Sequence, residues 1–273
     1  METLDLFKLN GELAVITGGA GLLGKEHATA LLDAGAKVVL LDIDKKRLKD
    51  EVKKFENKYG GRIWGLAIDV RDEKMIRMAI NKIEKGMGRI SILINNVAYN
   101  PPLTKRSDER LENFTLERWN EYIAIGLTSA FLMSKIIGKL MADRKKGVIV
   151  NISSDLGLIA PDQRIYKVAG LPREKQPAKA VGYSIVKHGI MGLTKYLATY
   201  WAEDGVRVNS LSPSGVGNEN IDKVFLEKLS SLIPMGRMAK KEEYRAAIIF
   251  LCSNASSYMT GSNLIVDGGR TCW

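Results

Sequence analysis

Short apolar runs alternate with helical patterns along the whole chain. Seven runs are apolar on both strand faces: 13–17, 37–42, 62–69, 90–95, 147–153, 206–212 and 263–267. Between them lie segments with apolar residues at spacings of three and four, such as 75–85 and 243–251. Strands buried on both faces and alternating with helices are typical of a parallel sheet covered by helices on each side. The pattern therefore predicts one doubly wound α/β domain over residues 1–273, with a seven-stranded parallel sheet.

Two stretches fit no regular element: 98–115, and 155–182, which holds three prolines. Both follow predicted strands. In doubly wound folds, ligands bind outside the carboxyl ends of the strands. Long irregular segments at that edge are more often substrate loops or lids than neutral insertions. We therefore expect both stretches to border a binding site.

A glycine-rich segment, TGGAGLLG (17–24), lies between the first predicted strand and the helical pattern KEHATALLDAG. It fits GxGxxG when Gly19 is the first glycine, and TGxxGxxG when Gly18 is. Glycines at such a turn let the backbone approach a pyrophosphate, whose charge rests on the helix N-terminus. The segment predicts a dinucleotide site under both alignments.

Asp42 ends the second predicted strand, eighteen residues beyond Gly24. An acidic side chain at this place can bind the ribose hydroxyls of a dinucleotide. A carboxylate there would also repel the 2′-phosphate of NADP. The sequence therefore predicts NAD as cofactor rather than NADP, unless Asp42 only caps the following helix.

The segment YSIVKHG places Tyr183 and Lys187 four residues apart. On a helix these side chains share one face, so the ammonium can stand near the phenol. A free tyrosine has a pKa near ~10, and a nearby cation favours the phenolate and suits it to proton transfer. NISS (151–154) ends the fifth predicted strand and would place Ser154 at the same edge, where it can bind a substrate oxygen.

These motifs together resemble the short-chain dehydrogenases/reductases. The resemblance covers nearly the whole chain, in order: TGGAGLLG, Asp42, IDV (68–70), NNVA (95–98), NISS, YSIVK, RVNSLSPSG (207–215) and TGSNLIVDGG (260–269). It implies a Rossmann fold and an oxidoreductase that moves a hydride between nicotinamide and an alcohol or ketone. It also implies a homotetramer or homodimer, in which the stretches 116–142 and 183–203 pack across two-fold axes.

The resemblance also implies roles for individual residues. Ser154, Tyr183 and Lys187 would be catalytic. Asp69 and Val70 would flank the adenine, and the segment from Pro213 to Val216 would border the nicotinamide. The implied cofactor-binding residues are Gly18, Gly21, Leu22, Leu23, Gly24, Asp42, Asp69, Val70, Asn95, Val97, Tyr183, Lys187, Pro213 and Val216.

Three features depart from the family. The glycine turn has the TGxxGxxG form of the longer, nucleotide-sugar-modifying branch, with Leu22 at the middle-glycine position of the shorter branch. Gly126 stands where the family usually has a proton-relay asparagine. Ser154 and Tyr183 are 29 positions apart, so 155–182 carries an insertion. Gly126 leaves an alternative open, an NAD-binding protein of this fold with weak or no turnover.

The insertion and the C-terminal sequence look most similar to oxidoreductases of flagellin modification and nonulosonic-acid synthesis. That similarity implies a sugar-like substrate, and such a sugar can bear a phosphate or carboxylate. Arg164, Arg173 and Lys175 in the insertion could face such a group, or they could be solvated loop charges.

Composition limits the kinds of partner that the protein is expected to bind. The net charge is +10, but the basic residues are scattered and form no stripe interleaved with aromatics, so we expect no nucleic acid. No apolar run approaches the ~18 residues of a membrane span, and no basic start with a long apolar stretch suggests a secretory signal. Two cysteines are too few for a disulfide framework. We expect a cytoplasmic protein without a metal, since neither His27 nor His188 has a second ligand at metal spacing.

Overall fold

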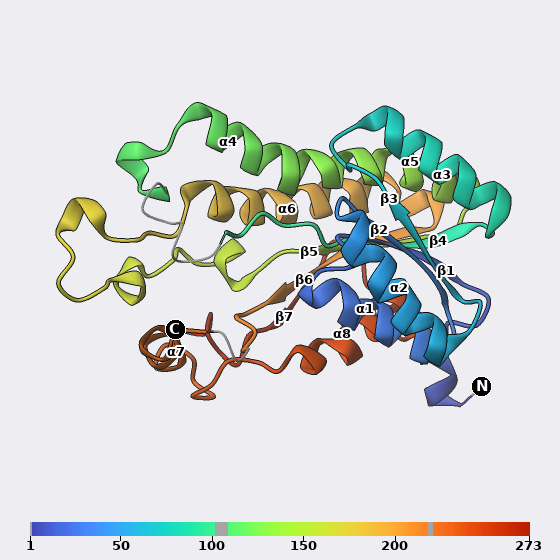
Figure 1. Ribbon diagram of the computed structural model, residues 1–273. Coiled ribbons are helices and arrows are strands. Elements are labelled where there is room, and N and C mark those ends of the chain that lie inside the picture. Colours follow the sequence, from blue (N-terminus) through green and yellow to red (C-terminus); the bar gives the residue numbers. More distant parts are fainter. Residues whose placement is uncertain (1, 102–108, 218–220) are drawn as a thin grey trace.

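The computed structural model describes residues 2–101, 109–217 and 221–273. They form one seven-stranded sheet in the order β3-β2-β1-β4-β5-β6-β7 (Figure 1). Every neighbouring pair is parallel. The strands are β1 (Leu13–Thr17), β2 (Lys37–Asp42), β3 (Ile63–Ala67), β4 (Ile90–Asn95), β5 (Gly147–Ile152), β6 (Val206–Pro213) and β7 (Asn263–Val266). The predicted doubly wound α/β fold is confirmed.

Helices cover both faces of the sheet (Figure 1). On one face lie α3 (Glu73–Gly86), α4 (Leu116–Ile123), α5 (Ser129–Asp143) and α6 (Val181–Tyr200). On the other lie α1 (Leu22–Asp33), α2 (Lys45–Tyr59) and α8 (Arg245–Cys252). The short α7 (Lys223–Ser230) stands beyond the carboxyl ends of the strands, near the irregular stretch 155–180.

Two apolar cores separate the layers. Successive strand residues point to opposite faces, so β1 sends Leu13 and Val15 into the core under α3 and α5. It sends Ala14 and Ile16 into the core under α1 and α8. This double burial explains the continuous apolar runs of the sequence.

The helical run 116–143 is continuous through a π-helical turn, Ala124–Thr128, between α4 and α5. By length and composition alone this run could cross a membrane. Half of its most apolar window is buried inside the protein. Packing on the sheet therefore accounts for its apolar character.

The irregular stretches differ little from expectation. Residues 155–180 form bends and three short 3₁₀ turns, Asp155–Gly157, Gln163–Tyr166 and Arg173–Lys175, and α6 takes up the last two residues of the predicted segment. Of 98–115, residues 102–108 lie outside the described residues, and Leu111–Asn113 form a 3₁₀ turn. The predicted strand 62–69 is shorter than expected and ends at Ala67.

Candidate active site

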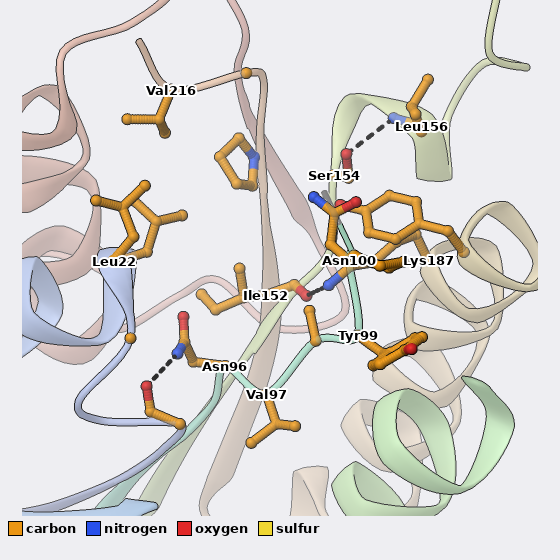
Figure 2. A pocket seen from close by; sticks show the side chains of 18 of the residues that line it. Leu22, Asn96, Val97, Tyr99, Asn100, Ile152, Ser154, Leu156, Lys187 and Val216 are labelled. Carbon is orange, nitrogen blue, oxygen red and sulfur yellow. Dashed lines mark hydrogen bonds between the residues drawn. The ribbon is translucent and has the colours of Figure 1, made fainter. Parts of the chain in front are cut away.

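One large cavity runs along the carboxyl ends of the strands, with a volume of about 1380 Å³. This exceeds the ~300–1,000 Å³ of a typical ligand pocket, so it has room for a dinucleotide and a substrate. Figure 2 shows Leu22 and Val216 on one side of it, with Ser154 and Lys187 across from them. The predicted residues that line it are Gly18, Gly21, Leu22, Leu23, Asp42, Asp69, Val70, Val97, Ser154, Tyr183, Lys187, Pro213 and Val216. Gly24 and Asn95 lie behind its wall.

The glycine turn brings backbone to the cavity. Gly18 has φ +61°, a left-handed conformation that favours glycine, and Gly21 is the N-cap of α1. A Cβ on Gly24 would collide with the Gly18 carbonyl, so Gly24 keeps the helix close to the turn. Gly19 instead faces β2, where a Cβ would meet Leu40. The TGxxGxxG alignment therefore describes the turn that lines the cavity, with the α1 N-terminus directed at it.

Asp42 ends β2 and is only 5% exposed. Its Oδ2 accepts from the Ala20 amide at 3.1 Å, and its Oδ1 accepts from the Asp44 amide at 3.1 Å. These bonds fix the carboxylate beside the glycine turn. Arg47, half exposed, also lines the cavity, and its Nη2 lies 3.3 Å from Asp42 Oδ1. A cation thus stands next to the residue predicted to repel a 2′-phosphate.

Three more of the predicted cofactor-binding residues stand at the carboxyl ends of strands: Asp69 and Val70 follow β3, and Asn95 ends β4. Asp69 pairs with Arg71 at 2.6 Å, and the hydrogen bonds from that arginine hold the pKa of Asp69 below its usual value. Val70 is buried and lines the cavity. Asn95 donates from Nδ2 to Ser134 and Asn151. Asn95 therefore joins the strands behind the site, as a support rather than a wall residue.

Ser154 lies just beyond the end of β5 and is 6% exposed. Its hydroxyl donates to Asp155 Oδ1 at 2.7 Å and accepts from the Leu156 amide at 3.2 Å. The other Asp155 oxygen accepts from the Ser214 hydroxyl at 3.0 Å. The buried Asp155 carboxylate therefore ties the serine to the segment that follows β6, a link that the sequence did not suggest.

Tyr183 and Lys187 project from the first turns of α6 into the same cavity. Lys187 is fully buried, and its Nζ donates to the Ile152 carbonyl at 2.7 Å, as drawn in Figure 2. The Nζ lies 5.8 Å from the centre of the Tyr183 ring. Burial lowers the pKa of Lys187 to about 8, because the interior disfavours the charged form.

Four cations on the cavity wall were not predicted from the sequence: Arg47, Arg71, Lys179 and Arg270. The Lys179 Nζ stands 3.6 Å over the Tyr183 ring and donates to Asn100 Oδ1 at 2.7 Å. Lys179 is four residues before Tyr183, a helical spacing that could have drawn attention to it. No sequence pattern marks Arg270, which reaches the cavity only through the fold.

The predicted cations of the insertion lie elsewhere. Arg164 is exposed and its guanidinium binds both oxygens of Asp162. Arg173 and Lys175 are exposed as well, and none of the three lines the cavity. The solvated-charge interpretation therefore fits them better than a contact with substrate.

Gly126 lies in the π-helical turn and is buried. A Cβ built on it would come within 2.5 Å of Val186 Cγ1. An asparagine side chain at this position would therefore collide with Val186, the residue before the lysine. The sequence shows that Gly126 lacks the asparagine amide, but it does not show that Val186 packs beside this position.

A metal site or a second reactive group would come from the other His, Cys, Asp and Glu side chains among the described residues. In the described parts of the chain, no group of three or more His, Cys, Asp or Glu is placed to hold a metal. Burial lowers the pKa of His27 to about 3 and raises that of the Cys252 thiol to about 12. Both side chains are therefore uncharged and inert at neutral pH.

The strand order, the glycine turn and the Tyr183–Lys187 pair beside one cavity define a nicotinamide-dependent oxidoreductase of CH–OH groups. A family model described as "short chain dehydrogenase" matches residues 12–229. The chain belongs to that family.

Similar proteins cover nearly the whole chain. D-threitol dehydrogenase of Mycolicibacterium smegmatis is 32% identical over 97% of this chain and 95% of its own length. NAD-dependent glycerol dehydrogenase of Listeria innocua is 33% identical over 97% and 96%. Among solved structures, gluconate 5-dehydrogenase from Burkholderia cenocepacia in complex with NADP and tartrate is 28% identical, with a TM-score of 0.84 and complete coverage of both chains.

Proposed function

We propose that the protein uses NAD to interconvert a secondary alcohol and a ketone on a polyhydroxylated, sugar-like substrate. The observation that carries this proposal is one cavity lined by Ser154, Tyr183 and Lys187 at the carboxyl edge and by Asp42 and the glycine turn beside them. The relatives above are named for threitol, glycerol and gluconate, which supports a substrate of several hydroxyl groups.

The residues present fit the dinucleotide. The amides at the α1 N-terminus would hold the pyrophosphate, and Asp42 would bind the ribose hydroxyls beside the adenine. Lys187 would bind the nicotinamide ribose. When bound, the nicotinamide supplies or accepts the hydride.

The chain's own chemistry is proton transfer and orientation. Tyr183 would pass a proton to or from the substrate oxygen through its hydroxyl, as general acid or base. Ser154 would turn its hydroxyl hydrogen from Asp155 towards that oxygen and hold it in line. The cations Lys179 and Lys187, which lie 3.6 and 5.8 Å from the Tyr183 ring centre, stabilise negative charge at the phenol.

The preference for NAD over NADP rests on the fixed Asp42 carboxylate. Arg47 acts against it, since an arginine near this position can bind the 2′-phosphate. We favour NAD because the Asp42 side chain is buried and held by two backbone amides, whereas Arg47 is half exposed. The relatives include NAD and NADP enzymes.

A protein that binds NAD with little turnover is the second candidate, motivated by Gly126. Because Val186 fills the space beside Gly126, a proton relay through that position would have to use another route. The three catalytic candidates nevertheless lie together, and this favours an active enzyme. A homo-oligomer and a role in flagellin or nonulosonic-acid modification are finer proposals from family resemblance. A cytoplasmic location is a proposal from composition.

Substitution of the tyrosine tests the proposal. Tyr183→Phe should lower turnover by ~10²–10⁴-fold, while NAD affinity stays nearly unchanged. Lys187→Ala should weaken both, because that side chain serves ribose and phenol together. Turnover is measured by NADH absorbance with D-threitol, glycerol and D-gluconate, and affinity by calorimetry. If Tyr183→Phe retained wild-type turnover on a substrate that the wild type oxidises, the proposed chemistry would be wrong.

A further inference from the structure

Arg270 is a buried cation on the cavity wall whose guanidinium no described carboxylate contacts directly. Its side chain is 8% exposed. Its Nε is buried with no hydrogen-bond partner, and its guanidinium forms no ion pair with any carboxylate of residues 2–101, 109–217 and 221–273. Burying an unpaired charge is unfavourable, and an anionic group of a bound ligand would compensate by pairing with the guanidinium.

The backbone that carries Arg270 is rigid. The turn after β7 passes through Gly268 and Gly269, both with positive φ. The Asp267 carboxylate accepts from the Gly269 amide and from the amide and hydroxyl of Thr271. The guanidinium therefore projects from a fixed turn, as a preorganised binding group would.

The nearby carboxylates are already engaged. Asp162 accepts from Arg164, chiefly through side-chain hydrogen bonds, which hold the pKa of Asp162 at about 2. Asp155 accepts from two serine hydroxyls and an amide. Asp222 caps α7 through the Phe225 amide. Among the described residues, Asp162 attracts Arg270 electrostatically, but its oxygens bind Arg164 and none of these three carboxylates contacts the Arg270 guanidinium.

Arg270 follows β7, and the position of β7 in the sheet separates this residue from the expected site of the cofactor phosphates. Neighbouring strands lie about 4.8 Å apart, so β7 stands about 19 Å from β1, whose turn would hold the pyrophosphate. From β5, which positions Ser154, β7 is only two strands away, about 10 Å. An arginine side chain shortens that gap. Arg270, in the turn after β7, therefore lies at the end of the cavity nearer to Ser154 than to the glycine turn.

We propose that Arg270 binds an anionic oxygen group, a carboxylate or a phosphate, at the far end of the substrate. Its planar fork fits both groups bidentately. Lys179, 7% exposed and on the same cavity wall, adds positive potential between this group and Tyr183. The substrate would then be a sugar acid or a sugar phosphate rather than a neutral polyol. This inference rests on the proposed function and narrows it.

The test compares three six-carbon probes, D-sorbitol, D-gluconate and D-sorbitol 6-phosphate, by calorimetry on the protein saturated with NADH. We expect at least one anionic probe to bind tenfold or more tightly than sorbitol. The stronger of the two identifies carboxylate or phosphate as the group. Equal binding of all three probes to the wild type would overturn the inference without any variant.

Two variants assign the effect to the residue. Arg270→Gln should lose tenfold or more of the affinity for the preferred anion, keep the affinity for sorbitol, and keep NADH binding. Lys175→Gln removes the same charge from an exposed position of the 155–182 stretch and should change nothing. Unchanged anion affinity in Arg270→Gln would overturn the inference. Failure to bind NADH would instead contradict the proposed function.

Discussion

Lys187 should make the stability of the protein depend on pH in a way that one substitution removes. Burial holds the pKa of Lys187 at about 8, against 10.5 for a free lysine. At about 1.4 kcal/mol per pH unit, this difference corresponds to about 3 kcal/mol of destabilisation when the lysine is charged. Lys187→Met keeps the length of the side chain and removes the charge.

The sign follows from proton binding. Below pH 8 the lysine is charged in the folded and unfolded states, so the wild type bears the full cost of burial. Between pH 8 and 10.5 only the unfolded state holds the proton, so wild-type stability rises with pH. Lys187→Met bears no such cost but loses the hydrogen bond to the Ile152 carbonyl, worth about 1 kcal/mol.

We therefore expect Lys187→Met to be more stable than the wild type by about 2 kcal/mol at pH 7. The advantage should fall by about 1.4 kcal/mol per pH unit above pH 8 and reverse between about pH 9 and pH 10. Urea denaturation of both proteins without cofactor at pH 7, 8, 9 and 10 measures it, and other titrations cancel in the difference. A difference that stayed constant from pH 7 to 10 would refute the reasoning.

Three further predictions concern cofactor, packing and assembly. The wild type should bind NAD more tightly than NADP, and Asp42→Ala should reverse the order by releasing Arg47 for the 2′-phosphate; calorimetry showing equal wild-type affinities would contradict this. Gly126→Ala should lower the free energy of unfolding, measured by urea denaturation, by about 1–3 kcal/mol, and by less in a Val186→Ala background. An equal loss in both backgrounds would contradict the predicted collision between the new Cβ and Val186. Light scattering should show a dimer or tetramer, whose interface would bury exposed aromatic side chains such as Phe131. A monomer at micromolar concentration would contradict this prediction.

The sheet was predictable because it is buried on both faces. Strands such as 13–17 and 37–42 contain almost no polar residue, and their observed bounds equal the predicted ones. Strand 62–69 was predicted too long because Ile68 and Asp69 leave the ladder to line the cavity. The hydrophobic pattern of a segment predicts that it is buried, but it does not predict which element packs against it.

The site was predictable only where chemistry follows from local spacing. Tyr183 and Lys187 share a helix face at any tertiary arrangement, so their proximity could be inferred. The positions of the charged side chains around the substrate could not be inferred in this way. Arg164 seemed a candidate because of its loop, yet it pairs with Asp162, while Arg270 arrives from the end of β7. Which loop charge faces a cavity depends on the path of the backbone in three dimensions.

The contact between Gly126 and Val186 also constrains the order in which substitutions can accumulate. An asparagine introduced at Gly126 alone meets Val186 Cγ1 and is selected against, whatever it offers to proton transfer. A smaller residue at Val186 alone opens a cavity. We expect each step to be harmful without the other, which would make the effects of the two substitutions non-additive. A lineage that has reached this pair is therefore held there, and its proton route has to evolve around it.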